Sequence, residues 1–296
     1  MATVDTSLLS PKLLSQLERL ELVSRKIYRG ASKGDRRSPR KGQSVEFADF
    51  RNYVPGDDFR FVDWNTYARL DKLFLKLFLE EEDLHFYALI DASPSMGFGE
   101  PTKLHFAKQL AASLGFVGLA RADRVRIETL GQTANNPGPI LRGRRSLWRM
   151  LDYLNGIEAD ENISFAEGVR NFCLRNSGNG IVVLLTDLMD KAGYETALRY
   201  LLARRMDVYV IHVLCREELE PEIQGDLRLV DCEDADVAEI TASAPLLARY
   251  RKTLNSFLGG AKDYCTRRGM SYVLARNDVA VDQVISNYLR NQGLVR

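Results

Sequence analysis

The order of apolar and polar positions after residue 84 predicts a sheet covered by helices. Short apolar runs, such as GIVVLLTD at 180–187, alternate with longer segments whose apolar residues recur every three or four positions. The first pattern is typical of a strand buried on both faces and the second of an amphipathic helix. The expected strands are 84–90, 124–130, 180–187, 207–214 and 271–275, and the expected helices are 102–121, 146–156, 164–176, 192–205, 244–268 and 279–290. This order predicts a doubly wound α/β fold with a mostly parallel sheet.

Two regions depart from this alternation. The segment DLRLVDCEDADVAEITA at 226–242 predicts a small two-stranded β excursion. Before residue 84, a Ser-Pro start and helically spaced leucines predict an amphipathic helix at 10–28, and short strands and turns are expected further on. We therefore expect an N-terminal elaboration at 1–83 and one main domain at 84–296.

Two features of the N-terminal elaboration suggest structural roles. The sequence Pro-Gly-Asp-Asp at 55–58 is typical of a rigid turn, because proline presets φ and glycine tolerates a positive φ. The alternative role of its two acids is to hold an arginine at position 51, 60 or 69 in a salt bridge. Trp64 is predicted to be a buried anchor that packs this segment on the sheet.

Composition favours a soluble globular protein. The 296 residues are 45% hydrophobic and 27% charged, and the apolar stretch at 110–120 is too short to span a bilayer. The first residues lack the basic and apolar regions of a secretion signal, so we expect a cytoplasmic protein without a membrane span. Cysteine and histidine are too scattered to predict a zinc site or a histidine-assisted nucleophile, and the cysteines are expected to be reduced.

Charge is distributed unevenly although the net charge is only +1. Residues 25–41 contain eight lysines or arginines and a single acid, together with Gly, Ser and Pro. Such a segment could contact nucleic acid or an acidic protein. We expect a solvated loop instead, because no aromatic residues alternate with the basic ones from residue 30 onward.

Polar residues gather where two of the expected strands end. Asp91 follows the apolar run at 84–90, and Asp187 ends the run that begins at 180. If these strands are neighbours, both carboxylates meet at the same edge of the sheet, where ligands bind in open α/β folds. Ser93 and Ser95 follow the first strand, and Ser164 begins a predicted helix.

The chemistry of this group indicates a divalent cation. Its five members, Asp91, Ser93, Ser95, Ser164 and Asp187, offer only oxygen ligands, which suit Mg²⁺ or Mn²⁺. Hydroxyl ligands add no charge, so a bound ion could still accept an acidic side chain from a partner protein. The structural alternative is that Asp and Ser simply favour loops. Ser164 could also be a helix cap, with Glu167 completing a capping box.

The motif DASPSM at 91–96 resembles the Asp-x-Ser-x-Ser signature of von Willebrand factor A domains. Their metal-ion-dependent adhesion site also uses a hydroxyl from a second loop and an aspartate from a third. Asp91, Ser93, Ser95 and Asp187 match this pattern, whereas Ser164 stands where that family usually has threonine. The segment with RNYVPGDD and the Asp63–Trp64 pair, followed by DASPSM, is similar to bacterial proteins of the domain of unknown function 58 family.

This resemblance implies a von Willebrand factor A type sheet and a function without catalysis. Members of the family are expected to work beside MoxR-type AAA+ ATPases in protein maturation or remodelling, in the cytosol or tethered to a membrane. The expected function is therefore a metal-dependent protein-interaction module. One alternative is a metal-dependent phosphoryl-transfer enzyme, but phosphatases of the haloacid-dehalogenase type would need an aspartate at Ser93. The other is a nucleic-acid binder that uses residues 25–41.

Overall fold

The computed structural model describes residues 8–24, 37–38, 47–78, 80–81, 84–130, 137–159, 164–176, 180–204 and 206–296. They belong to two compact units, a large one formed by 1–24 with 84–296 and a small one formed by 25–83. The large unit includes the N-terminal residues up to Ser24, which were expected to belong to the elaboration. Most of the basic segment 25–41 lies outside the described residues.

The large unit is built on a six-stranded sheet in the order β12-β9-β8-β5-β6-β7. Neighbouring strands are parallel except for β7, which runs antiparallel to β6 at one edge. The strands are β5 (His85–Asp91), β6 (Arg124–Leu130), β7 (Ile140–Arg142), β8 (Gly180–Thr186), β9 (Met206–Leu214) and β12 (Ser271–Arg276). The predicted mostly parallel α/β sheet is confirmed, and the short strand β7 is an addition to the predicted set.

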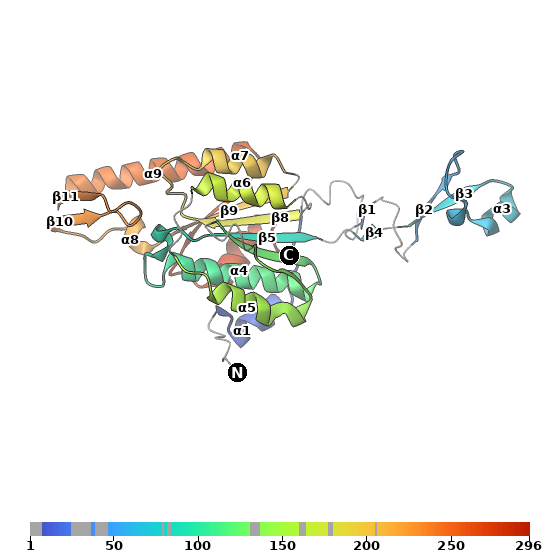
Figure 1. The fold of residues 1–296 in the computed structure, drawn as a ribbon, viewed down its shortest axis with the longest axis horizontal. Coiled ribbons are helices and arrows are strands. Elements are labelled where there is room, and N and C mark those ends of the chain that lie inside the picture. The colour runs from blue at the N-terminus through green and yellow to red at the C-terminus, as the bar shows by residue number, and fades with distance from the viewer. Residues whose placement is uncertain are drawn as a thin grey trace. The chain divides into compact units, whose positions relative to one another are not determined.

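Helices cover both faces of this sheet (Figure 1). In the view of Figure 1, α4 and α5 lie below the strands, and α6, α7 and α9 lie above them. The helices of the large unit are α1 (Pro11–Leu17), α4 (Lys103–Ala120), α5 (Leu147–Asn155), α6 (Phe165–Arg175), α7 (Glu195–Leu202), α8 (Arg216–Leu219), α9 (Ala244–Arg267) and α10 (Val281–Gln283), which a π-helical turn at Val284–Leu289 continues. Short 3-10 turns lie at Pro94–Gly97 and Arg144–Ser146. Among the described helices, none combines the length and apolar character needed to cross a membrane.

The central strands form a continuous core with the helices above them. Every residue of β8 and β9 is buried, as expected for strands covered on both faces. Val182 and Leu184 of β8 belong to one apolar cluster with Phe172 of α6 and Leu198 of α7. Because this packing fixes β8 against its neighbours, the residues at its carboxyl end are held on a rigid support.

The first helix is shorter than predicted. Helix α1 ends at Leu17, and the chain then becomes extended, so that Leu22 forms an antiparallel bridge with Val295. The backbone amide of Val23 donates to the carbonyl of Leu294 at 2.9 Å. Pairing with the C-terminal end of the chain therefore replaces the second half of the helix predicted at 10–28, and 25–28 lie outside the described residues.

The small unit contains a β-hairpin and short helical segments. Its elements are β1 (Arg37–Ser38), β2 (Phe47–Asn52), a 3-10 turn (Phe59–Phe61), α3 (Trp64–Leu70), β3 (Phe74–Phe78) and β4 (Glu80–Glu81), with β2 antiparallel to β3 and β1 antiparallel to β4. Asp57 binds both terminal nitrogens of Arg51 at 2.6 and 2.7 Å, and Asp58 binds Arg60. The acids of the turn thus form the salt bridges that were the alternative interpretation of this motif.

The prediction that Trp64 is a buried anchor is wrong. Its side chain is 56% exposed at the first position of α3. Asp63 caps this helix by accepting hydrogen bonds from the backbone amides of Asn65 and Thr66. The Asp-Trp pair thus begins a helix, and the indole ring lies edge-on to Tyr67 on the exposed side of the helix.

The predicted β excursion is present as the hairpin β10 (Gly225–Val230) and β11 (Val237–Ala242). Figure 1 shows it beside the first part of α9, at one end of the large unit. Most residues of the hairpin are exposed. The four cysteines are free thiols, as expected, and Cys232 at the hairpin tip is the exposed one.

Candidate metal centre at the strand ends

The two aspartates predicted to meet lie at the ends of neighbouring strands. Strand β5 pairs with β8 in parallel, with Ile90 opposite Leu185. Asp91 is the last residue of β5, and Asp187 follows the last residue of β8. Both side chains are buried. The expectation that these strands are neighbours is therefore confirmed, and the carboxylates share one edge of the sheet.

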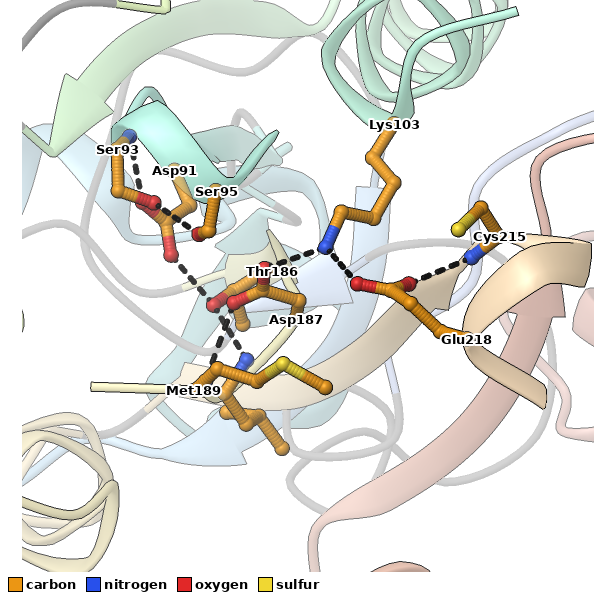
Figure 2. Close-up of polar contacts among 10 residues, drawn as sticks. Asp91, Ser93, Ser95, Lys103, Thr186, Asp187, Met189, Cys215 and Glu218 are labelled. Carbon is orange, nitrogen blue, oxygen red and sulfur yellow. Dashed lines mark hydrogen bonds and ion pairs between the residues drawn. The ribbon is translucent and has the colours of Figure 1, made fainter. Parts of the chain in front are cut away.

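Hydroxyl and amide groups surround the Asp91 carboxylate. Its Oδ1 accepts a hydrogen bond from the backbone amide of Ser93 at 3.0 Å, and its Oδ2 accepts one from the Thr186 hydroxyl at 2.6 Å (Figure 2). The hydroxyl oxygens of Ser93 and Ser95 lie 3.0 Å apart in the turn that follows β5. The sequence predicted both serines but missed Thr186, which directly precedes Asp187.

The electrostatic environment of Asp91 is unfavourable for a negative charge. Burial, followed by the negative charge of Asp187, raises its pKa to about 6, although the hydrogen bonds from Thr186 and Ser93 act in the opposite direction. When Asp91 is ionised, its carboxylate therefore lies buried beside the carboxylate of Asp187, with little access to water. A cation at this point would stabilise the ionised form of Asp91.

Lys103 is the residue of this region that the sequence analysis missed most clearly. It lies in the first turn of α4, and its side chain is fully buried. Its Nζ lies 2.7 Å from Oδ2 of Asp187 and 2.6 Å from Oε1 of Glu218, so the ammonium lies between two carboxylates (Figure 2). Burial acts to lower the pKa of Lys103, but the charges of Asp187 and Glu218 raise it overall, so the amine stays protonated.

The ion pairs of Lys103 join the strand-end site to a further segment of the chain. Oε2 of Glu218 accepts a hydrogen bond from the backbone amide of Cys215 at 2.8 Å, directly after β9. Oδ1 of Asp187 accepts one from the amide of Met189 at 3.1 Å. These contacts fix the orientation of the Asp187 carboxylate. A lysine in the first turn of an apolar helix was the available signal, because a cation is disfavoured at a helix N-terminus unless acids surround it.

Ser164 differs from the other four predicted site residues. It is exposed at the N-terminus of α6, and its hydroxyl makes no capping hydrogen bond, so the expected capping box with Glu167 is absent. Asp190 takes this role, because its Oδ2 accepts from the backbone amide of Phe165 at 3.0 Å. The start of α6 is thus tied to the loop that follows Asp187.

His212 on β9 lies behind the site without taking part in it. It is buried opposite Thr186 in the sheet, and its Nδ1 lies 2.8 Å from the Tyr272 hydroxyl. Burial lowers its pKa to about 4, although the charge of Asp187 acts in the opposite direction. The imidazole is therefore neutral at physiological pH.

The side chains of the site fit a hard divalent cation by their chemistry. They supply carboxylate and hydroxyl oxygens, which Mg²⁺ and Mn²⁺ prefer. Burial, followed by the charge of Asp187, raises the pKa of Asp91, so a cation here would favour its ionised form. Across the described part of the chain, no three Asp, Glu, His or Cys side chains form a metal-binding group. Metal binding here would therefore depend on two aspartates assisted by hydroxyls, while Lys103 engages one oxygen of Asp187.

Comparison with protein families agrees with the order of elements around this site. A family model described as "Protein of unknown function DUF58" matches residues 49–256. The chain belongs to the DUF58 family. The matched range begins within β2 of the small unit and includes both strand-end aspartates and the first half of α9. The expected membership of this family is thereby confirmed.

Similar proteins do not add a known activity. Uncharacterized proteins of Mycobacterium bovis and Mycobacterium tuberculosis are 27% identical over 241 residues, which is 80% of this chain and 76% of each relative. Among solved structures, the conserved hypothetical protein BatB from Bacteroides thetaiotaomicron has a TM-score of 0.43 at 16% identity, covering 70% of this chain and 98% of that one. An aerotolerance-related membrane protein from Bacteroides fragilis has a TM-score of 0.42 at 14% identity, covering 71% and 98%.

Proposed function

We propose that this chain is a non-enzymatic protein-interaction module of von Willebrand factor A type, whose strand-end site binds Mg²⁺ or Mn²⁺. Asp91, Ser93, Ser95 and Asp187 would hold the ion, with Ser164 or Thr186 supplying a further hydroxyl. The bound ion would supply a Lewis-acidic position for an acidic side chain of a partner. The partner we propose is a MoxR-type AAA+ ATPase engaged in protein maturation or remodelling.

The observation that carries this proposal is the pairing of Asp91 with Asp187 at the ends of adjacent buried strands. The two acids lie 96 positions apart in the sequence, and the hydroxyl of Thr186, the neighbour of Asp187, donates to Asp91. Among the described residues, a lysine pairs with Asp187 but none pairs with Asp91. Burial, followed by the charge of Asp187, raises the pKa of Asp91. A structural role alone would be served equally well by a neutral side chain at this position.

Metal binding is tested with Mn²⁺, whose free form is counted by electron paramagnetic resonance. The wild-type chain should bind about one Mn²⁺ ion per molecule, and Asp91→Asn should abolish this binding while preserving the fold. Glu239→Gln is the matched control, because Glu239 is an exposed acid on β11 away from the strand ends. Equal Mn²⁺ binding by wild type and Asp91→Asn would reject the site.

The proposed partnership is tested by retention of a MoxR-type ATPase on the immobilised full chain. Retention should require Mg²⁺, should be lost with a chelator, and should be lost in Asp91→Asn but kept in Glu239→Gln. Retention that ignores both the chelator and Asp91→Asn would remove this site from the interface. Metal-dependent release of phosphate from simple esters would contradict the non-enzymatic assignment.

A further inference from the structure

The chain that forms the β10–β11 hairpin carries an excess of negative charge. Residues 216–243 contain ten acids and two arginines. Lys103 and Lys191, from elsewhere in the large unit, pair with three of these acids. These ion pairs offset only part of the charge, so the segment as a whole attracts a basic partner.

The outer edge of β10 has no neighbouring strand in the described part of the chain. Strand β10 pairs with β11, and the irregular segment 221–224 leads directly into β10. Within the described residues, the backbone amides of Glu222, Ile223 and Gln224 donate no hydrogen bond to another protein group. An exposed strand edge with such backbone groups is a template to which an extended peptide can add as a further strand.

Apolar and polar side chains alternate along this edge. We call residues 220–229 the acidic edge; within it, Ile223 and Leu227 are half-buried, whereas Glu222 is exposed. Leu227 lies opposite Ile240 in the hairpin, so these two apolar side chains share one face. Because side chains alternate between the two faces of a strand, a strand added here would need apolar residues on this face and basic residues beside the acids.

A cavity of about 780 Å³ adjoins the start of the acidic edge. It lies between residues 221–225 and the first turn of α9, and Ala242 and Leu247 form part of its wall. Glu222 supplies its charged group. A second cavity, of about 400 Å³, shares Glu222 with the first and includes Arg251 of α9. The larger cavity therefore offers room for apolar side chains beside an acid, whereas Arg251 disfavours a basic residue in the smaller one.

We infer that the acidic edge is a docking site for an extended segment of a partner protein in which basic and apolar residues alternate. The occupant adds as a strand, its carbonyls accept hydrogen bonds from the backbone amides of 222–224, and its apolar side chains enter the larger cavity. Its lysines or arginines lie beside Glu222 and the acids further along the edge. A second copy of this chain is disfavoured as the occupant, because its own edge carries the same charge. This surface is separate from the strand-end site and binds without a metal ion.

The probe is the peptide fluorescein-Lys-Val-Lys-Leu-Lys-Val-Lys-amide, titrated with the full-length chain and followed by fluorescence anisotropy in the presence of a chelator. The salt concentration is about 0.15 M, so that charges more than about 8 Å apart are screened. The control peptide, fluorescein-Lys-Lys-Lys-Lys-Val-Leu-Val-amide, keeps the composition and charge but loses the alternation. Glu222→Lys is compared with Glu239→Lys, because both are exposed glutamates of the same acidic segment and each lies beside an arginine, Arg216 and Arg228 respectively.

Wild type should bind the alternating peptide about tenfold more tightly than the control peptide. Glu222→Lys should weaken binding of the alternating peptide about tenfold, because an attraction becomes a repulsion, whereas Glu239→Lys and Asp91→Asn should bind it as wild type does. At saturation, the bound peptide should slow hydrogen exchange of the backbone amides of 222–224.

Three results would overturn the inference. If wild type does not bind the alternating peptide, or binds both peptides equally, the edge does not select an alternating strand. If both charge reversals weaken binding equally, or exchange of the amides at 222–224 is unchanged, overall charge alone attracts the peptide. Loss of binding in Asp91→Asn would assign the peptide to the strand-end site. The proposed function is decided separately by Mn²⁺ binding, so either proposal can fail without the other.

Discussion

Replacement of Asp91 by asparagine should stabilise the metal-free protein at neutral pH. The pKa of Asp91 rises from 3.8 to about 6 on folding, mainly because the side chain is buried and then because Asp187 is near. Between these two pH values the folded chain holds a proton that the unfolded chain has released, so increasing pH favours unfolding. Above pH 6 the folded chain carries the full free-energy cost of ionising Asp91. A rise in pKa of about 2 pH units corresponds to a cost of about 3 kcal/mol.

Asparagine removes this penalty at the cost of one hydrogen bond. Its Oδ1 can still accept from the Ser93 amide, but its amide nitrogen cannot accept from the Thr186 hydroxyl as Oδ2 of Asp91 does. Loss of that bond costs about 1 kcal/mol. We therefore expect Asp91→Asn to increase the free energy of unfolding by about 2 kcal/mol at pH 7.5. At pH 4.5 only about 1 kcal/mol of the penalty remains, so the two proteins should be equally stable.

The assay is urea unfolding followed by circular dichroism, in a chelator, at pH 7.5 and pH 4.5. Asp187→Asn provides the opposite control, because it deprives the buried ammonium of Lys103 of one partner and should destabilise the chain by about 3 kcal/mol. Replacement by asparagine should thus increase the free energy of unfolding at Asp91 and decrease it at Asp187. An Asp91→Asn protein that is less stable than wild type at pH 7.5, or whose advantage is the same at both pH values, would refute this account of the site.

Further predictions concern the residues that support the site and the small unit. Lys103→Met should destabilise the chain by about 3 to 5 kcal/mol in urea unfolding, because it leaves two carboxylates buried without their ammonium; a loss below 1 kcal/mol would contradict the buried ion pairs. Asp190→Ala should lower the free energy of unfolding by about 1 kcal/mol, because the first amide of α6 loses its acceptor, whereas Ser164→Ala should change it little. A larger loss in Ser164→Ala than in Asp190→Ala would show that the serine is the cap. Trp64→Ala should leave unfolding within about 0.5 kcal/mol of wild type, because the ring is exposed, and a larger loss would show that it is covered in solution.

Local pattern was sufficient to predict the five parallel strands of the sheet and the place of Asp91 and Asp187 at strand ends. A continuous apolar run such as that of β8 has few other interpretations, and a polar residue directly after it must lie at the carboxyl end of the strand. Asp91 and Asp187 could therefore be brought together from the sequence. The order of the strands was not predicted, because helical connections between parallel strands restrict the topology without fixing which strands are neighbours.

The missed features depend on contacts that no local pattern encodes. The ion pairs of Lys103 join residues 84 and 115 positions apart, so their partners become visible only when α4 and α8 are placed on the sheet. Trp64 was assigned to the core by residue type, although its position at the start of α3 turns the ring outward. A serine before a helix is often a cap, but the Ser164 hydroxyl makes no such bond, and Asp190 of a neighbouring loop accepts from the first amide of the helix instead.

The distribution of charge explains how one site can be stable without a cation and still favour one. Lys103 neutralises one of its two carboxylate partners, so Asp187, Glu218 and ionised Asp91 together retain two negative charges. Protonation of Asp91 near its pKa of about 6 removes one of these charges, which reduces the electrostatic repulsion in the metal-free protein. A divalent cation would compensate both.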